Sequence, residues 1–252
     1  MKKISKYALI GLVLMSVIGG VFYFSQVQKA KNIKFIPGAN NSEYSPEINP
    51  NNFVATVNNK YFTLTPGTKF TYENKTDEGL ERIEVVVTDK IKLVMGINAA
   101  VVWDRAWLNG ELIEDTKDWY AQDKKGNVWY LGESVDNYVQ GKLDNHAGSW
   151  EAGVDDAKPG IIMLNNPQIG NSYRQEYYKG QAEDMGEIVA LGIKITVPYG
   201  TFENCLQTRD WSALEKSQGE FKYYCPDVGL VVMEESVAGE QEKVELINVS
   251  SQ

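Results

Sequence analysis

The stretch DWYAQDKKGNVWYLGE, Asp118–Glu133, sets two aromatic clusters on either side of a short charged segment. Residues 123–127, Asp-Lys-Lys-Gly-Asn, suit a type I turn with Gly126 in the left-handed conformation. Strand-forming residues flank this turn on both sides, because aromatic and β-branched side chains fit a pleated surface. We therefore predict a β-hairpin here.

Counting outward from the turn predicts which residues face each other across the hairpin. Tyr120 lies opposite Tyr130, and Trp119 lies opposite Leu131. Because side chains alternate between the two faces of a strand, one face of the hairpin is apolar enough to join a core. We interpret the aromatic residues as sheet packing rather than as a ligand platform.

A second turn lies directly upstream. Asn109-Gly110 separates two strand-like runs and is a strong signal for a two-residue hairpin. In a regular register Arg105 faces Glu114 across that hairpin. Residues 100–133 are thus predicted to form a three-stranded meander.

The rest of the chain from residue 53 onward repeats this pattern. Short β-branched or aromatic runs are bounded by Asn, Gly, Pro or Asp, and no segment sustains a helical period over three turns. Parallel strands need long crossover connections, usually helices, so strands without helices indicate an antiparallel sheet. The sequence predicts an all-β domain.

The chain begins with MKKISK and an uncharged apolar run, Tyr7–Phe24. At about 1.5 Å per residue this run forms a helix of about 27 Å, close to the bilayer hydrocarbon thickness of about 30 Å. We predict an uncleaved membrane anchor. A cleaved signal is the alternative, because residues 17–19 form a passable cleavage site. No cysteine follows the run, which excludes a lipoprotein anchor.

Composition then divides the chain into three parts. Residues 1–30 are the membrane anchor or signal sequence, and residues 31–52, rich in Pro, Asn and Ser, are a linker. Residues 53–252 are the antiparallel β domain. We predict that this domain is exported into the cell envelope and is a monomer.

The charge distribution limits the partners. All 34 acidic residues lie beyond residue 31, and with 21 basic residues the segment 30–252 carries a formal charge of −13. That field repels a phosphate backbone, so we predict no nucleic-acid partner. The predicted partners are the membrane, through the N-terminal helix, and an envelope protein, polymer or lipid.

Residues with catalytic or metal-binding chemistry form no recognisable motif. His146 is the only histidine, and Ser149 beside it lacks a GxSxG context. One histidine and two distant cysteines cannot supply the usual zinc ligands. No EF-hand or phosphate-binding pattern occurs either, although an acidic loop leaves incidental calcium binding open. We predict no enzyme activity, no cofactor, no metal and no catalytic residue.

Carboxylates are the remaining option for catalysis, since glycosidases use two of them about 5–10 Å apart. Many acidic surfaces meet that spacing by chance, so we interpret the acidic residues as solvent-exposed. Those that crowd together in the sequence are Asp104, Glu111, Glu114, Asp115, Asp118, Glu151, Asp155 and Asp156.

Most of the six tryptophans lie in strand-like segments and are expected in the core. Trp150, in a glycine-rich segment, and Trp211, after a strand end, are the two that we expect to be exposed. They are the candidate aromatic contacts for a ligand such as a sugar.

Several phrases resemble exported bacterial proteins of unassigned function, among them GSWEAGV (Gly148–Val154), KPGIIML (Lys158–Leu164) and EFKYYCPDVGLV (Glu220–Val231). With VPYGTFENCLQT (Val197–Thr208), the last is similar to the closing strands of TapB-like proteins. That group is similar to envelope proteins with curved antiparallel sheets, including lipoprotein carriers. The resemblance implies a single strongly curved sheet, a half-barrel or a sandwich, with an apolar cavity as one option.

The two cysteines lie on runs that fold back on each other. If Trp211 faces Gly219, the same register sets Gln207 opposite Tyr223 and Cys205 opposite Cys225. Opposed residues of antiparallel strands have Cα atoms about 4.5–5.5 Å apart, within the range of a disulfide. We predict a Cys205–Cys225 disulfide; two buried free thiols are the alternative.

Three functions remain open. A non-catalytic binding or structural module of the cell envelope is the first. A carrier of apolar ligands in a β cavity is the second, and a hydrolase that acts on glycans is the third. An enclosed apolar pocket would favour the carrier, and two close carboxylates in a cleft, one with a raised pKa, would favour the hydrolase.

Overall fold

The computed structural model describes residues 44–214, 219–236 and 243–251. These residues are almost entirely strands and turns, with one 3-10 turn at Pro50–Asn52 and no α-helix among them. No helix in this part of the chain is long and apolar enough to cross a membrane. The expected membrane helix, residues 7–24, lies outside the described residues.

One antiparallel sheet of 16 strands makes up the domain, as the sequence predicts. A separate two-stranded hairpin, β2 (Asn58–Asn59) and β3 (Phe62–Thr63), stands beside it. The strands of the sheet are β1 (Phe53–Val54), β4 (Thr68–Thr76), β5 (Gly79–Val94), β6 (Ile97–Leu108), β7 (Glu111–Asp123), β8 (Val128–Val139), β9 (Lys142–Asn145), β10 (Trp150–Glu151), β11 (Lys158–Met163), β12 (Ser172–Arg174), β13 (Glu176–Tyr177), β14 (Asp184–Val197), β15 (Gly200–Ser212), β16 (Glu220–Tyr224), β17 (Val231–Ser236) and β18 (Lys243–Ser251).

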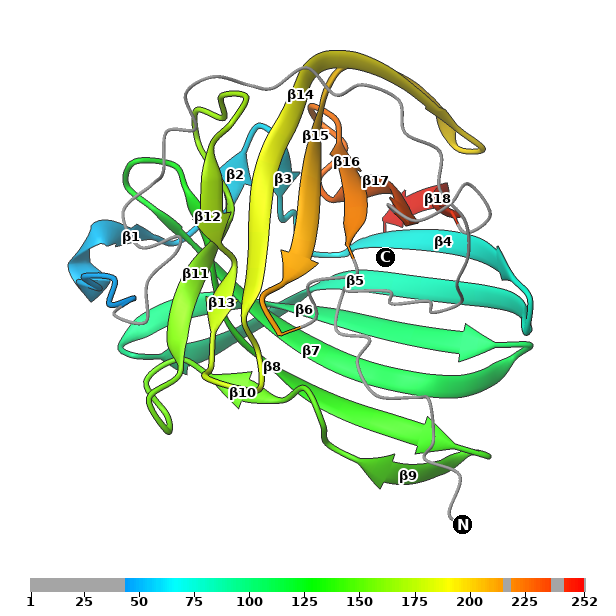
Figure 1. Ribbon diagram of the computed structural model, residues 1–252, viewed down its shortest axis with the longest axis horizontal. Helices are drawn as coiled ribbons and strands as arrows, with labels where there is room; N and C mark the ends of the chain where they lie inside the picture. Colours follow the sequence, from blue (N-terminus) through cyan, green and yellow to red (C-terminus); the bar gives the residue numbers. More distant parts are fainter. Residues whose placement is uncertain (1–43, 215–218, 237–242, 252) are drawn as a thin grey trace.

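The sheet curls into a barrel shape that is nearly closed, which is a stronger curvature than a half-barrel (Figure 1). Its path runs β12-β14-β15-β16-β17-β18-β4-β5-β6-β7-β8-β11-β13. The two ends of this path meet in one segment, residues 172–177. Its first half, β12, pairs with β14, and its second half, β13, pairs with β11. Closure therefore depends on a kink at Gln175, whose N–H donates to the Asp184 carbonyl at 2.9 Å.

The central hairpin forms as predicted, with one correction. Tyr120 faces Tyr130, and Gly126 adopts φ +89° in the turn. Trp119, however, faces Gly132 and not Leu131, because Leu131 is the extra residue of a β-bulge. Gly132 has φ +133°, a conformation that favours glycine.

The upstream hairpin needs the same kind of correction. Asn109 and Gly110 form the predicted turn, with φ of 52° and 84°. A register shift between Ala106 and Trp107 sets Arg105 opposite Asp115, so the predicted Arg105–Glu114 pair is wrong. Glu114 instead shares the inner face with Ala106, which it opposes.

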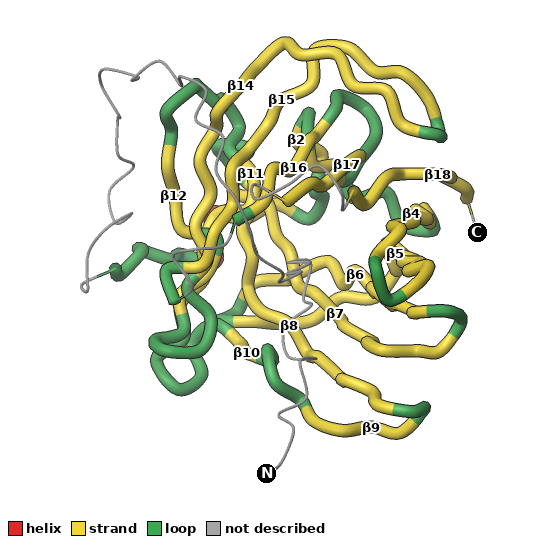
Figure 2. The backbone as a smooth tube through the Cα atoms, turned by 45° about the vertical axis from the view of Figure 1, so that its right-hand side comes forward, coloured by secondary structure: helices red, strands yellow, loops and turns green. Residues whose placement is uncertain are grey.

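The inside of the sheet is divided along the strands into two layers. One end is apolar and is plugged by the β2–β3 hairpin, whose strand β2 is labelled in the upper half of Figure 2. The Phe62 ring packs edge-on against Tyr120, with centroids 5.1 Å apart, and lies 6.5 Å from Tyr224. The backbone N–H of Thr63 donates to the Gly229 carbonyl and fixes the hairpin in place.

Residues 44–52, the end of the expected linker, lie against the domain. Tyr44 is buried and its hydroxyl donates to the Pro159 carbonyl at 2.8 Å. The Lys158 ammonium donates to the Tyr44 carbonyl. The boundary between linker and domain at residue 53 stays a prediction.

The Cys205–Cys225 disulfide is present, with Cα atoms 4.1 Å apart. The register that predicted it also holds, since Gln207 faces Tyr223. Both cysteines are fully buried. The bond therefore joins the end of β16 to β15 inside the core.

Candidate functional site: a buried acidic cluster inside the sheet

The second layer of the interior is acidic. Ten carboxylate side chains from nine strands are buried there, and we call them the interior acidic cluster. None of them is more than 8% exposed. Its members are Glu81, Asp104, Glu114, Asp118, Glu133, Glu176, Asp184, Asp210, Glu220 and Glu234.

The cluster spans the inside of the curved sheet. Asp118 on β7 interacts electrostatically with Lys222 on β16, and Asp104 on β6 with Glu234 on β17. In the sheet, β17, β18, β4, β5 and β6 lie between β16 and β7. Strands are about 4.8 Å apart, so the path along the sheet is about 29 Å. The members of each pair therefore face each other across the interior, near enough for their charges to interact.

Alternation along each strand brings these residues inward. On β7 the buried positions Glu114, Thr116, Asp118 and Tyr120 are spaced by two, so their side chains share one face. Glu114 and Asp118 are at the acidic level, and Tyr120 is at the level of the Phe62 plug. On β16 the same spacing orders Glu220, Lys222 and Tyr224. On both β7 and β16, the inward-facing residues therefore change from carboxylates to a tyrosine toward the apolar end.

Lys222 supplies the positive charge on one side of the cluster. Its Nζ lies 3.0 Å from Glu220 Oε1 and 3.6 Å from Glu234 Oε1. Burial disfavours the ammonium, but these carboxylates outweigh burial and hold the pKa of Lys222 well above its ordinary value. Among the described residues, Arg174 is the one other buried basic side chain, and its guanidinium lies 4.6 Å from the ring centre of Tyr177.

Asp118 and Glu133 form the opposite side and face each other across β7 and β8. The Tyr130 hydroxyl donates to Asp118 Oδ1 at 2.7 Å. Within the described chain, Asp118 Oδ2 and Glu133 Oε2 are buried without a hydrogen-bond partner. Burial raises the pKa of Asp118 to about 7, against the lowering effect of the Tyr130 and Tyr120 hydroxyls and of the Lys222 charge. Burial and the neighbouring carboxylates of Glu176 and Asp118 hold the pKa of Glu133 well above its ordinary value.

Other members of the cluster are perturbed in the same direction. Burial is the largest cause of the raised pKa of Asp104, and the nearby Asp118 and Glu114 carboxylates add to it. For Glu176, burial comes first and Asp184 second. Carboxyl groups that are buried close together hold their protons, because the ionised form is poorly solvated and is repelled by its negatively charged neighbours.

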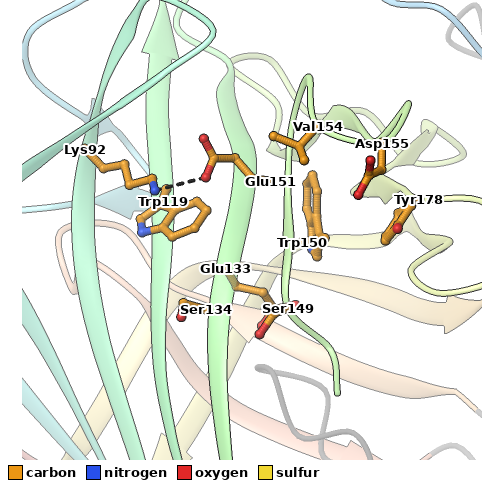
Figure 3. Close-up of a pocket in the computed structure, with 10 residues that line it drawn as sticks. All are labelled: Lys92, Trp119, Glu133, Ser134, Ser149, Trp150, Glu151, Val154, Asp155 and Tyr178. Carbon is orange, nitrogen blue, oxygen red and sulfur yellow. Dashed lines mark ion pairs between the residues drawn. The ribbon is translucent and has the colours of Figure 1, made fainter. Parts of the chain in front are cut away.

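A pocket of about 390 Å³ opens on the outside of the sheet, and Glu133 is the one member of the cluster among its lining residues. Figure 3 shows Lys92 and Trp119 on one side of this pocket, and Trp150 and Tyr178 on the other. The Lys92 ammonium lies 4.2 Å from the Trp119 ring centre and pairs with Glu151 at 2.9 Å. Its other lining residues are Ser134, Ser149, Val154 and Asp155.

His146 and Ser149 do not form a nucleophile–base pair by any contact in the structure. His146 is exposed, and its Nδ1 lies 2.7 Å from Asp136. Ser149 Oγ accepts a hydrogen bond from the Val135 N–H at 2.8 Å. Both side chains thus hold the loop 146–149 to β8.

The two tryptophans that we expected to be exposed differ in their environment. Trp150 is only 4% exposed, so that expectation was wrong for it. It pairs with Glu133 in the sheet, which turns the indole inward against Tyr130, with ring centroids 5.3 Å apart. Trp211 is half-buried, and the Arg209 guanidinium lies 5.4 Å from its ring centre.

The acidic residues singled out from the sequence separate into two groups. Asp104, Glu114 and Asp118 are buried, so the expectation that they are solvent-exposed was wrong. Asp115 faces outward, where it accepts from the Trp103 indole at 2.8 Å. Sequence reasoning missed the remaining carboxylates of the cluster and Lys222. In the sequence these residues appear as charged residues at alternate strand positions, as in EFKYYC. The same pattern is expected for a strand face exposed to solvent, so it does not distinguish a buried acidic face.

Within residues 44–214, 219–236 and 243–251, no three His, Cys, Asp or Glu side chains are arranged to hold a metal ion. The carboxylates of the cluster are distributed around the interior instead.

Comparisons with known proteins give no family. No family model matches the chain, and no curated protein matches its sequence. A crystal structure described as that of a "putative lipoprotein" from Parabacteroides distasonis matches with a TM-score of 0.41 and 14% identity, covering 75% of this chain and 98% of that chain. The resemblance to TapB-like proteins stays a prediction.

Proposed function

We propose that the β domain is a non-catalytic binding module of the cell envelope that holds its ligand at the interior acidic cluster. The observation that carries this proposal is the pair of oxygens Asp118 Oδ2 and Glu133 Oε2, which are buried inside the sheet and have no hydrogen-bond partner among residues 44–214, 219–236 and 243–251. Buried polar groups are normally satisfied, and an unsatisfied one costs about 1–3 kcal/mol. A bound ligand that satisfies these oxygens would offset that cost.

The pocket at Glu133 supports access to this site. Its lining includes Trp119, Trp150 and Tyr178 together with polar side chains, a composition common in ligand sites. The apolar end of the interior is filled by Phe62, Tyr120 and their neighbours. This filling favours a polar ligand over the apolar ligand of a carrier.

A glycan hydrolase is the second candidate, because Asp118 and Glu133 are neighbouring carboxyls with raised pKa. A general acid of a glycosidase needs a raised pKa. Ten carboxyls in one cluster exceed the two that this chemistry uses, which is why we place binding first.

The test is identification of what copurifies with the full chain, by native mass spectrometry. The wild-type protein is compared with Glu133→Gln and with Glu203→Gln, a matched change at a side chain 68% exposed. We expect a bound species that Glu133→Gln loses and Glu203→Gln keeps. A species retained equally by both variants would refute a site inside the sheet, and turnover of a glycan panel that Glu133→Gln abolishes would establish the hydrolase instead.

A further inference from the structure

We infer that the ligand of the interior acidic cluster is an organic polycation, a chain that carries several primary or secondary ammonium groups. The inference rests on the proposed function, since it names the ligand class of the same site. Two opposite sides of the interior support this ligand class: the side around Lys222 and the side around Asp118 and Glu133.

Lys222 shows how this interior holds an alkylammonium group. Its side chain is a four-carbon chain ending in an ammonium, and Glu220 and Glu234 bind that ammonium at 3.0 and 3.6 Å. Tyr224 lies next to it on the same face of β16. Carboxylates for the charge and an aromatic ring for the chain are thus combined at one place.

The side at Asp118 and Glu133 has the same chemistry without a lysine. Asp118 Oδ2 and Glu133 Oε2 are buried and have no hydrogen-bond partner among the described residues, although the Tyr130 and Tyr120 hydroxyls both interact with the Asp118 carboxylate. Tyr120 and Tyr130 stack below them, with centroids 4.9 Å apart, and Trp150 packs against Tyr130. An ammonium group placed here meets two carboxylates, which bind cations through charge-assisted hydrogen bonds.

The distribution of the carboxylates favours a chain over a single compact cation. They come from strands on both sides of the interior, and Asp104 links the two sides through its interactions with Asp118 and Glu234. One point charge would reach only a few of them. Several ammonium groups spaced by methylene segments would reach separate carboxylates in turn.

The charge of the whole domain supports the same ligand class. Residues 30–252 carry 34 acidic and 21 basic residues. A negative potential of this kind raises the local concentration of cations and their association rate. It repels anionic ligands equally.

Binding at this site is coupled to proton release. The carboxyl groups of Asp118 and Glu133 hold their protons above ordinary pKa values, so an ammonium ligand must displace those protons. Affinity therefore rises from pH 5.5 to pH 8. The titratable and charged groups that interact with the pair are Asp104, Glu114, Tyr120, Tyr130, Glu176, Asp184 and Lys222. Glu81, Asp210, Glu220 and Glu234 belong to the same cluster and interact with its other members.

The experiment is isothermal titration of the full chain with spermine, a linear tetraamine, at pH 5.5, 7 and 8. We expect binding that strengthens with pH and releases protons, as shown by titrations in buffers of different ionisation enthalpy. Asp118→Asn and Glu133→Gln should each weaken binding about tenfold, because charge-assisted hydrogen bonds are lost. Asp89→Asn and Glu203→Gln, matched changes on exposed side chains, should leave affinity within about twofold.

Four results would overturn the inference. Equal weakening in the interior and exposed variants would mean surface attraction only. Calcium or magnesium that binds more tightly than spermine and competes with it would mean a metal site. No spermine binding, with a different copurified species that Glu133→Gln loses, would refute the polycation while the proposed function stands. No species of any kind at the interior would refute both.

Discussion

Asp118 and Lys222 interact across the inside of the sheet although five strands lie between them in strand order. The interaction reflects how strongly the sheet is curved, because a flat sheet would hold the two charges far apart. It also shows that the interior is not a conventional apolar core. The consequence for stability is a dependence on pH that an apolar core would lack.

We predict that the full chain loses stability as pH rises from 4 to 7. A carboxyl whose pKa is raised on folding binds its proton more tightly in the folded state, so unfolding becomes easier above its unfolded pKa of about 3.8. For Asp118 the loss is complete a little above its folded pKa of about 7. The stability contributed by the raised pKa of Lys222 is fully present throughout this window and is lost only as the pH rises above about 10.5.

Asp118→Asn isolates this contribution. The amide oxygen still accepts from the Tyr130 hydroxyl, but no charge has to be buried. We expect Tm at pH 8 to rise by about 2–4 °C for each kcal/mol recovered, and no gain at pH 4. Thermal unfolding followed by circular dichroism measures it, with Asp89→Asn as the exposed control. The same gain at both pH values would contradict a titration effect.

The sequence predicts the hairpins of this fold, but it does not predict which residues line the inner face of the sheet. Turn residues such as Asn109-Gly110 determine which strands pair, and that information is local. The bulges at Leu131 and near Trp107 arise from packing between strands, so counting residues outward from a turn fails there.

The sequence did not predict that the acidic residues are buried, and the reason is different. Alternation tells which residues share a face, but it assigns the charged face to solvent by default. On β16 that default is inverted, since Lys222 is 4% exposed and its neighbour Phe221 is half-buried on the other face. Only the curvature of the whole sheet, closed by residues 172–177, places charged faces from distant strands together.

Gly132 is required by the close approach of β10 to β8. A Cβ at this position would lie 2.4 Å from the Trp150 carbonyl oxygen and 2.9 Å from Glu151 Cα. We predict that Gly132→Ala lowers the free energy of unfolding by at least 2 kcal/mol, roughly the upper range of strain at a special backbone conformation.

Gly141→Ala is the matched control for that change. Gly141 also has a positive φ, +69°, but nothing lies within 4 Å of an added Cβ. We expect it to cost about 1 kcal/mol, from backbone strain alone. Urea unfolding of both variants measures the difference, and equal losses would show that β10 is not tightly packed on β8.

The native chain is predicted to stay in the membrane after a high-salt wash. An apolar helix at residues 7–24 is held by burial and not by charge, so screening of charges does not release it. Fractionation of cells followed by detection of the chain tests this. Recovery from the culture medium with an N-terminus near Gly20 would establish the cleaved signal.

The disulfide is expected to contribute about 3 kcal/mol to stability, because it closes a loop with a sequence separation of 20 residues. The bond joins β15 to the end of β16, and β16 also carries Glu220 and Lys222. We therefore predict that the double change Cys205→Ser and Cys225→Ser lowers Tm by about 6–12 °C. It should also weaken whatever binds at the cluster, since β16 loses its covalent link to β15. Thiol titration of the denatured, unreduced wild-type chain is the accompanying control, and two free thiols per chain would show that the bond does not form in the exported protein.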